Sequence, residues 1–427
     1  MRCLLFPVGS YGDVHPYVGL GLELQARGHE VIVCTSEHFR SLCERVGLTF
    51  EAIDTQEEFE ATIGNPRLFH PLRGMGTLAR QIMIPWQRRQ FDFIRQNHLP
   101  GETVIVGSLL GLGLSAAREV LGVPWVSVHL QPMLFWSDLV PPRVTAHVPV
   151  GPNWPPTWNR ALFSTAVWIM LDRIVRRPIN DFRRELNLPP VRTSSQLWHS
   201  PDKVLGLFPE WFAPPQPDWP AHTVLTGFPL WDESHDTHLD DDLEAFLAAG
   251  PPPVAFTPGS AMLHGQRFFE TAAQACEQAG LRGLLLTRFP ERQLPQRLPP
   301  GVRHVRYAPF SRLLPRCAAL VYHGGIGTLS QACAAGVPHL IMPMSHDQPD
   351  NAARIHRLGV GDEIRQRSFT PTAVANKLRH LTQSAEVHQA CQQVKTRMMN
   401  QPSGLTIAAN EVEAALAAQP SLAEKSF

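Results

Sequence analysis

A histidine followed by a glycine-rich turn is the segment of this chain best suited to bind a charged ligand. The turn reads HGGIGT at positions 323–328, between an apolar run at 318–322 and a helical pattern that ends at Gly336. Glycine lets the backbone approach a ligand closely, and the N–H groups and positive dipole end of a helix attract anions. The segment predicts a diphosphate site, with an ordinary strand-to-helix turn as the alternative interpretation.

A second polar pair follows the next apolar run. Asp347 and Gln348 come after the run 340–344, which places them at the carboxyl end of the next expected parallel strand. Open α/β sheets bind ligands at that edge. A carboxylate and an amide can together accept and donate hydrogen bonds, as the recognition of sugar hydroxyls requires. The pair and the turn together favour a site for an activated nucleotide sugar.

A third candidate group lies near the start of the chain, in the stretch GSYGDVHP at positions 9–16. We expect Asp13 at the N-cap of a helix over 14–27 and Pro16 in its first turn. Asp13 is the favoured general base, because an aspartate at a helix start is ionised and ready to accept a proton at neutral pH. His15 is a competing base, and a plain helix cap remains an alternative. The G-x-G-x-x-G spacing of a dinucleotide site is absent.

The elements that must position these residues alternate between strand-like and helix-like patterns, and the order restarts near residue 253. Strands are expected at 2–8, 30–35, 103–108, 125–130, 203–208 and 223–226, and then at 254–257, 283–287, 302–307, 318–322 and 339–342. The helical patterns include 37–46, 267–279, 328–335 and 351–358. This order predicts an α/β chain of two Rossmann-like, doubly wound parallel-sheet domains that face each other across a cleft.

The expected boundaries follow from composition. Residues 1–226 form the first domain, which would bind the acceptor, and a polar, proline-bearing linker covers 227–242. Residues 243–403 form the second domain, which would bind the donor. A final helix from about Leu405 to Ala418 lies in the segment 404–427, and we expect it to cross back to the first domain.

Composition excludes several classes of protein. The chain has 427 residues, with 38 basic and 38 acidic side chains that form no long block, so no basic face for nucleic acid is expected. Its seven cysteines are isolated on apolar faces, as in buried thiols of a cytoplasmic protein. No apolar run approaches the roughly 20 residues that span a bilayer.

No metal site is expected from the acidic or histidine-bearing segments. No D-x-D follows a strand, and the acidic run 240–242 is typical of a helix start, where the dipole favours negative charge. His235 and His238 have no matching cysteine or carboxylate cluster, so they are interpreted as a surface pair.

Two further segments of the first domain have alternative interpretations. His129, Met133, Phe135 and Trp136 are candidates for an apolar acceptor pocket, although core packing explains them almost as well. Arginines and apolar residues interleave over 168–184. That helix could rest on an anionic membrane surface, but a solvated basic helix face is the favoured interpretation.

Several of these segments resemble one family. The stretches GSYGDVHP at 9–16, GHEV at 28–31 and the whole of 308–361 are similar to the inverting nucleotide-sugar glycosyltransferases of family one, which have the GT-B fold. The similarity extends over nearly the whole chain. The segments 64–68, 105–109, 199–216 and 226–230 look like the branch that contains the rhamnolipid-forming rhamnosyltransferases and the glycolipid and sterol glycosyltransferases.

The resemblance implies a role for each candidate residue. Asp13 corresponds to the general base that takes the proton of the acceptor hydroxyl. His323 corresponds to the residue that hydrogen-bonds the donor phosphate, and backbone N–H groups near Gly325, Gly327 and Thr328 would stabilise the leaving diphosphate.

The remaining donor contacts are implied in the same way. Asp347 and Gln348 correspond to the pair that holds sugar hydroxyls, and the turn Gly259-Ser260 corresponds to a further phosphate contact. Tyr307 corresponds to the aromatic side chain that stacks on the base. Gln331 stands where plant relatives have a glutamate on the ribose hydroxyls, which an amide can also bind.

The function implied by the resemblance is the transfer of a glucose- or rhamnose-type hexose from a UDP- or dTDP-sugar to a hydroxyl of an apolar, lipid-like acceptor. No metal or other cofactor is expected, and the location is cytoplasmic, with peripheral contact at the inner face of the membrane as an option. A GT-B-fold epimerase of nucleotide sugars and a non-catalytic nucleotide-sugar-binding protein are the alternatives. Asp13 beside an apolar cleft favours transfer over both.

Overall fold

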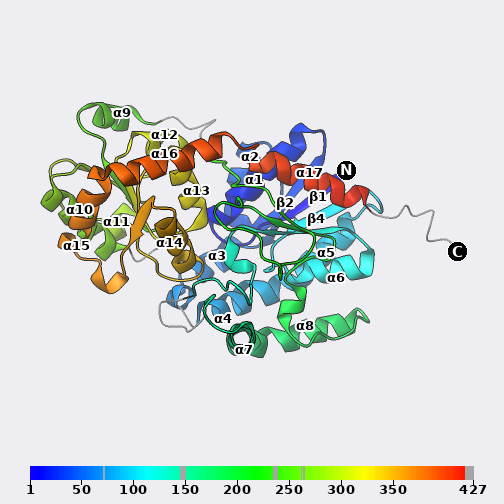
Figure 1. Ribbon diagram of the computed structural model, residues 1–427. Coiled ribbons are helices and arrows are strands. Elements are labelled where there is room, and N and C mark those ends of the chain that lie inside the picture. The colour runs from blue at the N-terminus through cyan, green and yellow to red at the C-terminus, as the bar shows by residue number, and fades with distance from the viewer. Residues whose placement is uncertain (71–72, 145–150, 234–238, 261, 263–264, 419–427) are drawn as a thin grey trace.

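Two parallel sheets, each covered by helices, make up the computed structural model of the chain (Figure 1). The structure describes residues 1–70, 73–144, 151–233, 239–260, 262 and 265–418. The sheets have seven and six strands, and each neighbouring pair in them is parallel. The prediction of two doubly wound α/β sheets is confirmed.

The first sheet has the strand order β3-β2-β1-β4-β5-β6-β7. The order reverses at β1, which pairs with β2 on one side and β4 on the other, and ligands of such sheets bind where this reversal opens a crevice. Four consecutive side chains of β1 are fully buried, as expected for a strand covered on both faces. The strands are β1 Arg2–Phe6, β2 Glu30–Ser36, β3 Thr49–Asp54, β4 Thr103–Gly107, β5 Trp125–His129, β6 Lys203–Gly206 and β7 Thr223–Leu225.

The second sheet has the order β10-β9-β8-β11-β12-β13, with its reversal between β8 and β11. The turns that follow β8 and β11 therefore open at one crevice. The strands are β8 Val254–Thr257, β9 Gly283–Leu286, β10 Val302–Val305, β11 Ala319–Tyr322, β12 His339–Ile341 and β13 Gly361–Glu363.

Helices of the first half cover both faces of its sheet, and α4, α7 and α8 form its lower edge in Figure 1. Two stretches, Ala79–Met83 and Trp168–Asp172, are π-helical turns that join α4 to α5 and α7 to α8. The α-helices are α1 Tyr11–Ala26, α2 Arg40–Arg45, α3 Gln56–Ile63, α4 Gly74–Leu78, α5 Ile84–Asn97, α6 Leu112–Leu121, α7 Pro156–Val167 and α8 Arg173–Glu185; the short 3-10 turns are Glu37–Phe39, Pro66–Phe69, Pro132–Leu134 and Ser194–Leu197.

Helices of the second half include α13 and α14, which follow the two predicted ligand turns. The α-helices are α9 Asp241–Ala248, α10 Gln266–Ala279, α11 Pro290–Gln293, α12 Phe310–Leu313, α13 Ile326–Ala335, α14 Gln348–Arg357, α15 Pro371–Gln383 and α16 Ala385–Met399; the 3-10 turns are Leu314–Arg316 and Gln366–Ser368.

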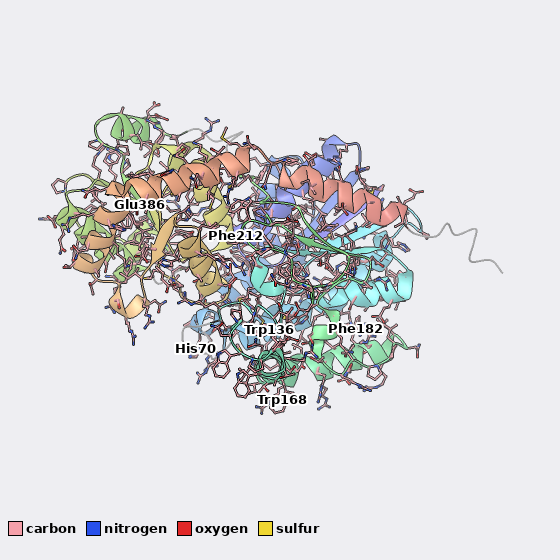
Figure 2. The ribbon with its side chains drawn as sticks, viewed as in Figure 1. His70, Trp136, Trp168, Phe182, Phe212 and Glu386 are labelled. Atoms are coloured by element: carbon pink, nitrogen blue, oxygen red, sulfur yellow. The ribbon has the colours of Figure 1, made fainter. Side chains whose placement is uncertain are left out.

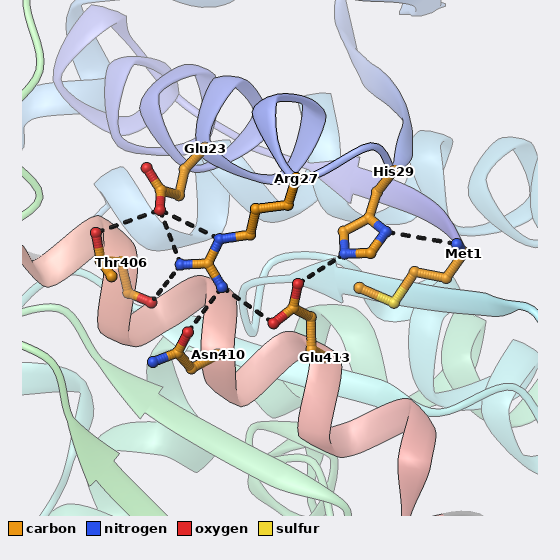
Figure 3. Close-up of polar contacts among 7 residues, drawn as sticks. All are labelled: Met1, Glu23, Arg27, His29, Thr406, Asn410 and Glu413. Carbon is orange, nitrogen blue, oxygen red and sulfur yellow. Dashed lines mark hydrogen bonds and ion pairs between the residues drawn. The ribbon is translucent and has the colours of Figure 1, made fainter.

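The last described helix, α17 Gly404–Ala417, returns from the second half and packs on α1 (Figures 1 and 3). Arg27 donates to Asn410 Oδ1 at 2.7 Å and to Glu413 Oε2 at 3.0 Å, and His29 Nε2 lies 2.7 Å from Glu413 Oε1. Ala408 and Val412 are fully buried on the inner face of α17. A polar cluster and an apolar stripe therefore fix this helix to the first half.

Two local expectations are wrong, and two strands were not predicted. Ser10 rather than Asp13 is the N-cap of α1, and Pro16 lies inside that helix rather than in its first turn. Strands β3 and β13 carry polar residues at the sheet edges, so neither has the apolar run that marks a buried strand.

The structure also bears on the acidic segment at 240–242, the cysteines and the expected absence of a membrane span. Asp240 caps α9 by accepting from Leu243 N at 2.7 Å, as an acidic helix start should. His235 and His238 lie outside the described residues. All seven cysteines are buried free thiols. No helix in the described part of the chain is long and apolar enough to cross a bilayer.

Candidate active site

His323 lies between β11 and α13 with its ring held among glycines. A Cβ on Gly259 would lie 2.8 Å from His323 Cε1, and one on Gly325 would lie 2.5 Å from Nε2, so only glycine fits at either position. Burial lowers the pKa of His323 to about 4, so the ring is neutral at pH 7. Its Nδ1 is buried and has no hydrogen-bond partner among the described residues. An unpaired buried nitrogen is costly, and a ligand that binds it would recover that free energy.

The N-terminus of α13 lies directly after this histidine. Gly325 is the N-cap, and Gly327 and Thr328 are partly exposed in the first turn. First-turn N–H groups have no partner within a helix and carry the positive end of its dipole. The structure therefore places the predicted diphosphate donors and His323 together at one turn. The other predicted phosphate contact, Gly259-Ser260, lies against His323 through Gly259, while Ser260 is exposed.

Asp347 and Gln348 lie at the start of α14, beside the same turn. Asp347 is the N-cap and is buried, and Asn351 Nδ2 donates to its Oδ2 at 2.6 Å and to the Gly324 carbonyl at 2.9 Å. Asn351 thus ties the pair predicted to bind the sugar to the turn predicted to bind the diphosphate, a contact that the sequence did not reveal.

The two members of the pair differ chemically. Burial raises the pKa of Asp347 to about 7, and the negative charge of Asp13 contributes to the rise. The Oε1 atom of Gln348 accepts from Met344 N at 2.7 Å and Ser345 N at 3.1 Å. Gln348 therefore has only its Nε2 amide to offer a sugar hydroxyl, whereas Asp347 can accept.

Asp13 faces this group from the first half. Its Oδ2 accepts from Ser10 N at 2.8 Å and from Ser10 Oγ at 3.2 Å, while burial raises its pKa against the effect of these bonds. Gly9 has a φ of 137°, and any side chain there would collide with the Asp13 carboxylate. The loop Gly9-Ser10 therefore fixes the carboxylate and needs a glycine to do so.

His15, the competing base, points toward the linker. Its Nε2 lies 3.6 Å from Glu233 Oε1, and its ring packs edge-on to Trp231 at 5.1 Å and to Tyr11 at 5.5 Å. Glu233 also forms an ion pair with Arg45. The structure therefore separates the two candidate bases, with Asp13 in the glycine loop and His15 against the linker.

Tyr307 lies under a cation that the sequence did not single out. The guanidinium of Arg288 lies 5.0 Å from the Tyr307 ring centroid and 4.2 Å from that of Tyr11. Burial and the nearby charge of Glu233 raise the pKa of the Tyr307 hydroxyl. One face of Tyr307 is thus covered by Arg288, so a nucleobase would have to use the other face or displace the arginine.

Gln331 borders an open pocket of about 280 Å³. Its other wall is Leu230, Trp231 and Asp232, which belong to the expected linker and for which no role in binding was predicted. Ser311, also in the wall, donates through N and Oγ to the Asp232 carboxylate at 2.9 and 3.1 Å. The volume approaches that of small-ligand pockets, so a nucleoside is a reasonable occupant.

The four acceptor candidates do not form one wall. His129 is fully buried, and its Nε2 lies 3.0 Å from His199 Nδ1. Phe135 is 2% exposed and packs edge-on to His129, with ring centroids 5.1 Å apart. Both belong to the aromatic core, as the core-packing interpretation expects. Met133 and Trp136 are partly exposed, and they remain the candidates with surface to offer.

The two halves are joined near the donor turns by an arginine that sequence patterns could not identify. The backbone N–H of Arg143 donates to Asp350 Oδ1 at 2.9 Å, and its guanidinium makes a two-pronged bond to Glu363 at 3.0 and 2.8 Å. A two-pronged arginine–carboxylate contact fixes geometry as well as charge. Among the described residues, no three histidine, cysteine or acidic side chains converge as metal ligands would.

Two family models match this chain. The glycosyltransferase family 28 N-terminal domain matches residues 3–92, which contain the Asp13 loop. The C-terminal domain of the erythromycin biosynthesis protein CIII-like family matches residues 282–414, which contain both donor turns.

Individual proteins match over most of the chain. O-mycaminosyltylonolide 6-deoxyallosyltransferase from Streptomyces fradiae is 34% identical over 372 residues, which is 84% of each chain. The solved glycotransferase of kitacinnamycin has a TM-score of 0.75 at 19% identity and covers 97% of this chain and 99% of its own. Glycosyltransferase VinC in complex with dTDP has a TM-score of 0.68 at 20% identity over 98% and 100%. At these identities the two matches establish a shared fold.

Proposed function

The chain belongs to the family-one glycosyltransferases of the GT-B fold, enzymes that use nucleotide sugars, and from that premise we propose that it transfers a deoxyhexose from a dTDP-sugar to a hydroxyl of an apolar natural-product aglycone. The name of the 34%-identical relative specifies a 6-deoxyallosyl group and O-mycaminosyltylonolide. VinC, which shares the fold, was solved with dTDP. These names support the sugar, nucleotide and acceptor classes of the proposal.

One observation carries the proposed chemistry. The first turn of α1 meets the first turn of α13, since a Cβ on Gly327 would lie 3.5 Å from the Gly12 carbonyl oxygen. Asp13, next to Gly12, therefore lies near the first turn of α13, and its negative charge acts on Asp347. A base on one wall and diphosphate donors on the other are what an in-line displacement at an anomeric carbon needs.

Each residue has one part in the proposed step. The acceptor oxygen attacks the anomeric carbon, its proton passes to Asp13, and the bond from that carbon to the diphosphate breaks on the opposite side. The anomeric configuration is thereby inverted. The raised pKa of Asp13 suits this role, because a general base works best with a pKa nearer the working pH.

The donor half holds the leaving group and the sugar. The Nδ1 atom of His323 and the first-turn N–H groups of α13 bind the diphosphate and stabilise the charge that develops on it. Asp347 accepts from a sugar hydroxyl and the Gln348 amide donates to one. Gln331, in the linker-lined pocket, reads the nucleoside sugar. None of these steps uses a metal ion.

A second candidate is transfer of glucose or rhamnose to a lipid-like acceptor, as in the glycolipid branch that parts of the sequence resemble. The observation that favours it is the exposed apolar surface around Trp168 on α7 and the turn that follows, which would suit contact with lipid. The two candidates share the donor turns and the base, and they differ in the acceptor. Rhamnose is itself a deoxyhexose, so only glucose as the sugar would also distinguish them.

A donor and acceptor panel tests the proposal. The purified chain is incubated with dTDP-deoxyhexoses, dTDP-rhamnose among them, and with UDP-glucose. Each donor is combined with macrolide aglycones and with hydroxylated lipids, and products are read by mass spectrometry. The proposal expects product with a dTDP-deoxyhexose and an aglycone, with an anomeric configuration opposite to that of the donor. Exclusive transfer to lipids would establish the second candidate instead, and a product of retained configuration would overturn the displacement step.

A further inference from the structure

Exposed tryptophans gather on one edge of the first half. Ten large apolar side chains are exposed among the described residues, and four of them lie between 154 and 169. Trp154 is 45% exposed, Trp168 49% and Ile169 52%. Figure 2 shows Trp168 at the lower margin of the molecule, away from the donor half. Isolated exposed apolar residues need no explanation, but such a cluster within one helix and its ends does.

One face of helix α7 is fixed against the rest of the first half. Asn159 is fully buried and its Nδ2 donates to the carbonyls of Asp138 at 2.8 Å and Gly151 at 3.0 Å. Phe163, one turn later, stacks on Trp136 with ring centroids 4.2 Å apart, and Val167 is buried. Positions 159, 163 and 167 thus form the inner stripe, which leaves the opposite side of the helix to solvent.

Arginines outnumber the acidic residues beside this apolar surface. Residues 151–180 contain four arginines at 160, 173, 176 and 177 and one acidic residue, Asp172. Asp172 is buried and accepts from Ser194 N at 2.8 Å, so it does not face solvent. The four arginines are exposed, and the guanidinium of Arg173 lies over the Trp168 ring at 5.3 Å. Arg160 and Arg177 have carboxylate neighbours in Asp138 and Asp181, which flank the surface.

Tryptophan with arginine is the composition of a surface that lies in the headgroup region of a bilayer. Indole rings partition to the boundary between acyl chains and headgroups, while arginine pairs with lipid phosphates. A second copy of this chain fits less well, because a two-fold contact through the same surface would bring its arginines together. We propose that the Trp154–Arg177 surface docks on an anionic lipid bilayer.

The docking surface is independent of which sugar or acceptor the enzyme uses. The surface does suit an apolar acceptor. On its inner side α7 packs Phe163 against the acceptor candidate Trp136, and directly after α7 the side chain of Trp168 is exposed to solvent. Figure 1 shows α7 and α8 beneath the first sheet and distant from α17, so docking would leave the contact between α17 and α1 untouched.

Vesicle co-sedimentation of the full chain, without donor or acceptor, tests the proposal. Vesicles of phosphatidylcholine alone are compared with vesicles that also contain phosphatidylglycerol, at low and high salt. We expect partitioning to be about tenfold or more stronger on the anionic vesicles and to be lost in high salt, because each arginine near an anionic surface adds to the attraction and salt screens it. Equal partitioning on both vesicle types, or binding that salt does not weaken, would overturn the proposal.

Matched variants distinguish binding through this surface from attraction that depends only on the net charge of the chain. Arg173→Glu with Arg177→Glu should lower partitioning on anionic vesicles about tenfold or more, whereas Arg365→Glu with Arg367→Glu, the same charge change on exposed residues of the second half, should not. Trp168→Ser with Ile169→Ser should weaken binding relative to Met399→Ser on α16. Should the tryptophan variant instead convert a dimer to a monomer in light scattering, the surface would be an interface between copies. The salt dependence of the unaltered chain decides the matter even if a variant fails to fold.

Discussion

Gly12 and Gly327 lie so close together that a Cβ added to Gly327 would be 3.5 Å from the Gly12 carbonyl oxygen and 3.6 Å from its Cα. These residues belong to the first turns of α1 and α13. Two helix N-termini thus meet at one point, and the positive ends of both dipoles point toward the space where a diphosphate would bind.

Bulk at Gly327 should disturb this contact in proportion to its size. Gly327→Ala adds a Cβ at ordinary contact distance and should be tolerated, whereas Gly327→Val would push α1 away and weaken donor binding by about tenfold, on the scale of a lost hydrogen bond to a charged group. Calorimetric titration with dTDP measures both. Equal affinity for the valine variant and the unaltered chain would show that the two turns do not enclose the diphosphate.

His323→Ala and Gln331→Ala should weaken nucleotide binding in different ways. His323 meets a phosphate common to all donors, so its loss should cost about tenfold or more for both UDP and dTDP. Gln331 can read only the nucleoside sugar, so its loss should affect UDP, which has a ribose 2′-hydroxyl, more than dTDP. Parallel titrations with the two nucleotides check this, and an equal loss for both in the Gln331 variant would remove its role in reading the ribose.

The buried Asp347 should make stability depend on pH. Its pKa is raised from 3.8 to about 7, so the folded chain holds this proton where the unfolded chain has lost it. The stabilising contribution of protonated Asp347 to the free energy of unfolding is fully present below about pH 4 and is lost as the pH rises through about 7. Asp347→Asn keeps an oxygen for Asn351 and removes the titration, so its melting temperature should exceed that of the unaltered chain at pH 7 and converge with it near pH 4. Parallel melting curves that differ by a constant amount across this range would contradict the assignment.

The sequence predicted the elements whose signal is local. Apolar runs such as 254–257 and 318–322 became buried central strands. The glycines at 324 and 325 became the turn between strand and helix, with Gly327 in the first turn of α13. Strands β3 and β13 escaped detection because polar residues at a sheet edge have no such run. The start of α1 was misplaced because Ser10 and Asp13 are both good capping residues, and the folded loop decides between them.

Residues that act through tertiary contacts could not be found in this way. Arg288 reaches Tyr11 from the other half of the molecule, and Asn351 connects two turns that are separate in the sequence. Trp231 and Asp232 lie in the segment expected to be a linker, and only the fold places them against Gln331. Burial of His129 and Phe135 likewise depends on partners, such as His199, that lie far along the chain.

The most direct test of the account is the comparison of Asp13→Asn with His15→Ala in a transfer assay, with donor affinity measured in parallel. Asp13→Asn removes the carboxylate base while leaving α13 intact, so transfer should fall about 10²-fold or more with donor affinity unchanged, the scale of a lost general base. His15→Ala should retain most of the activity, because its ring faces Glu233 and Trp231. Near-normal turnover by Asp13→Asn together with an inactive His15→Ala variant would contradict the account and assign the base to His15.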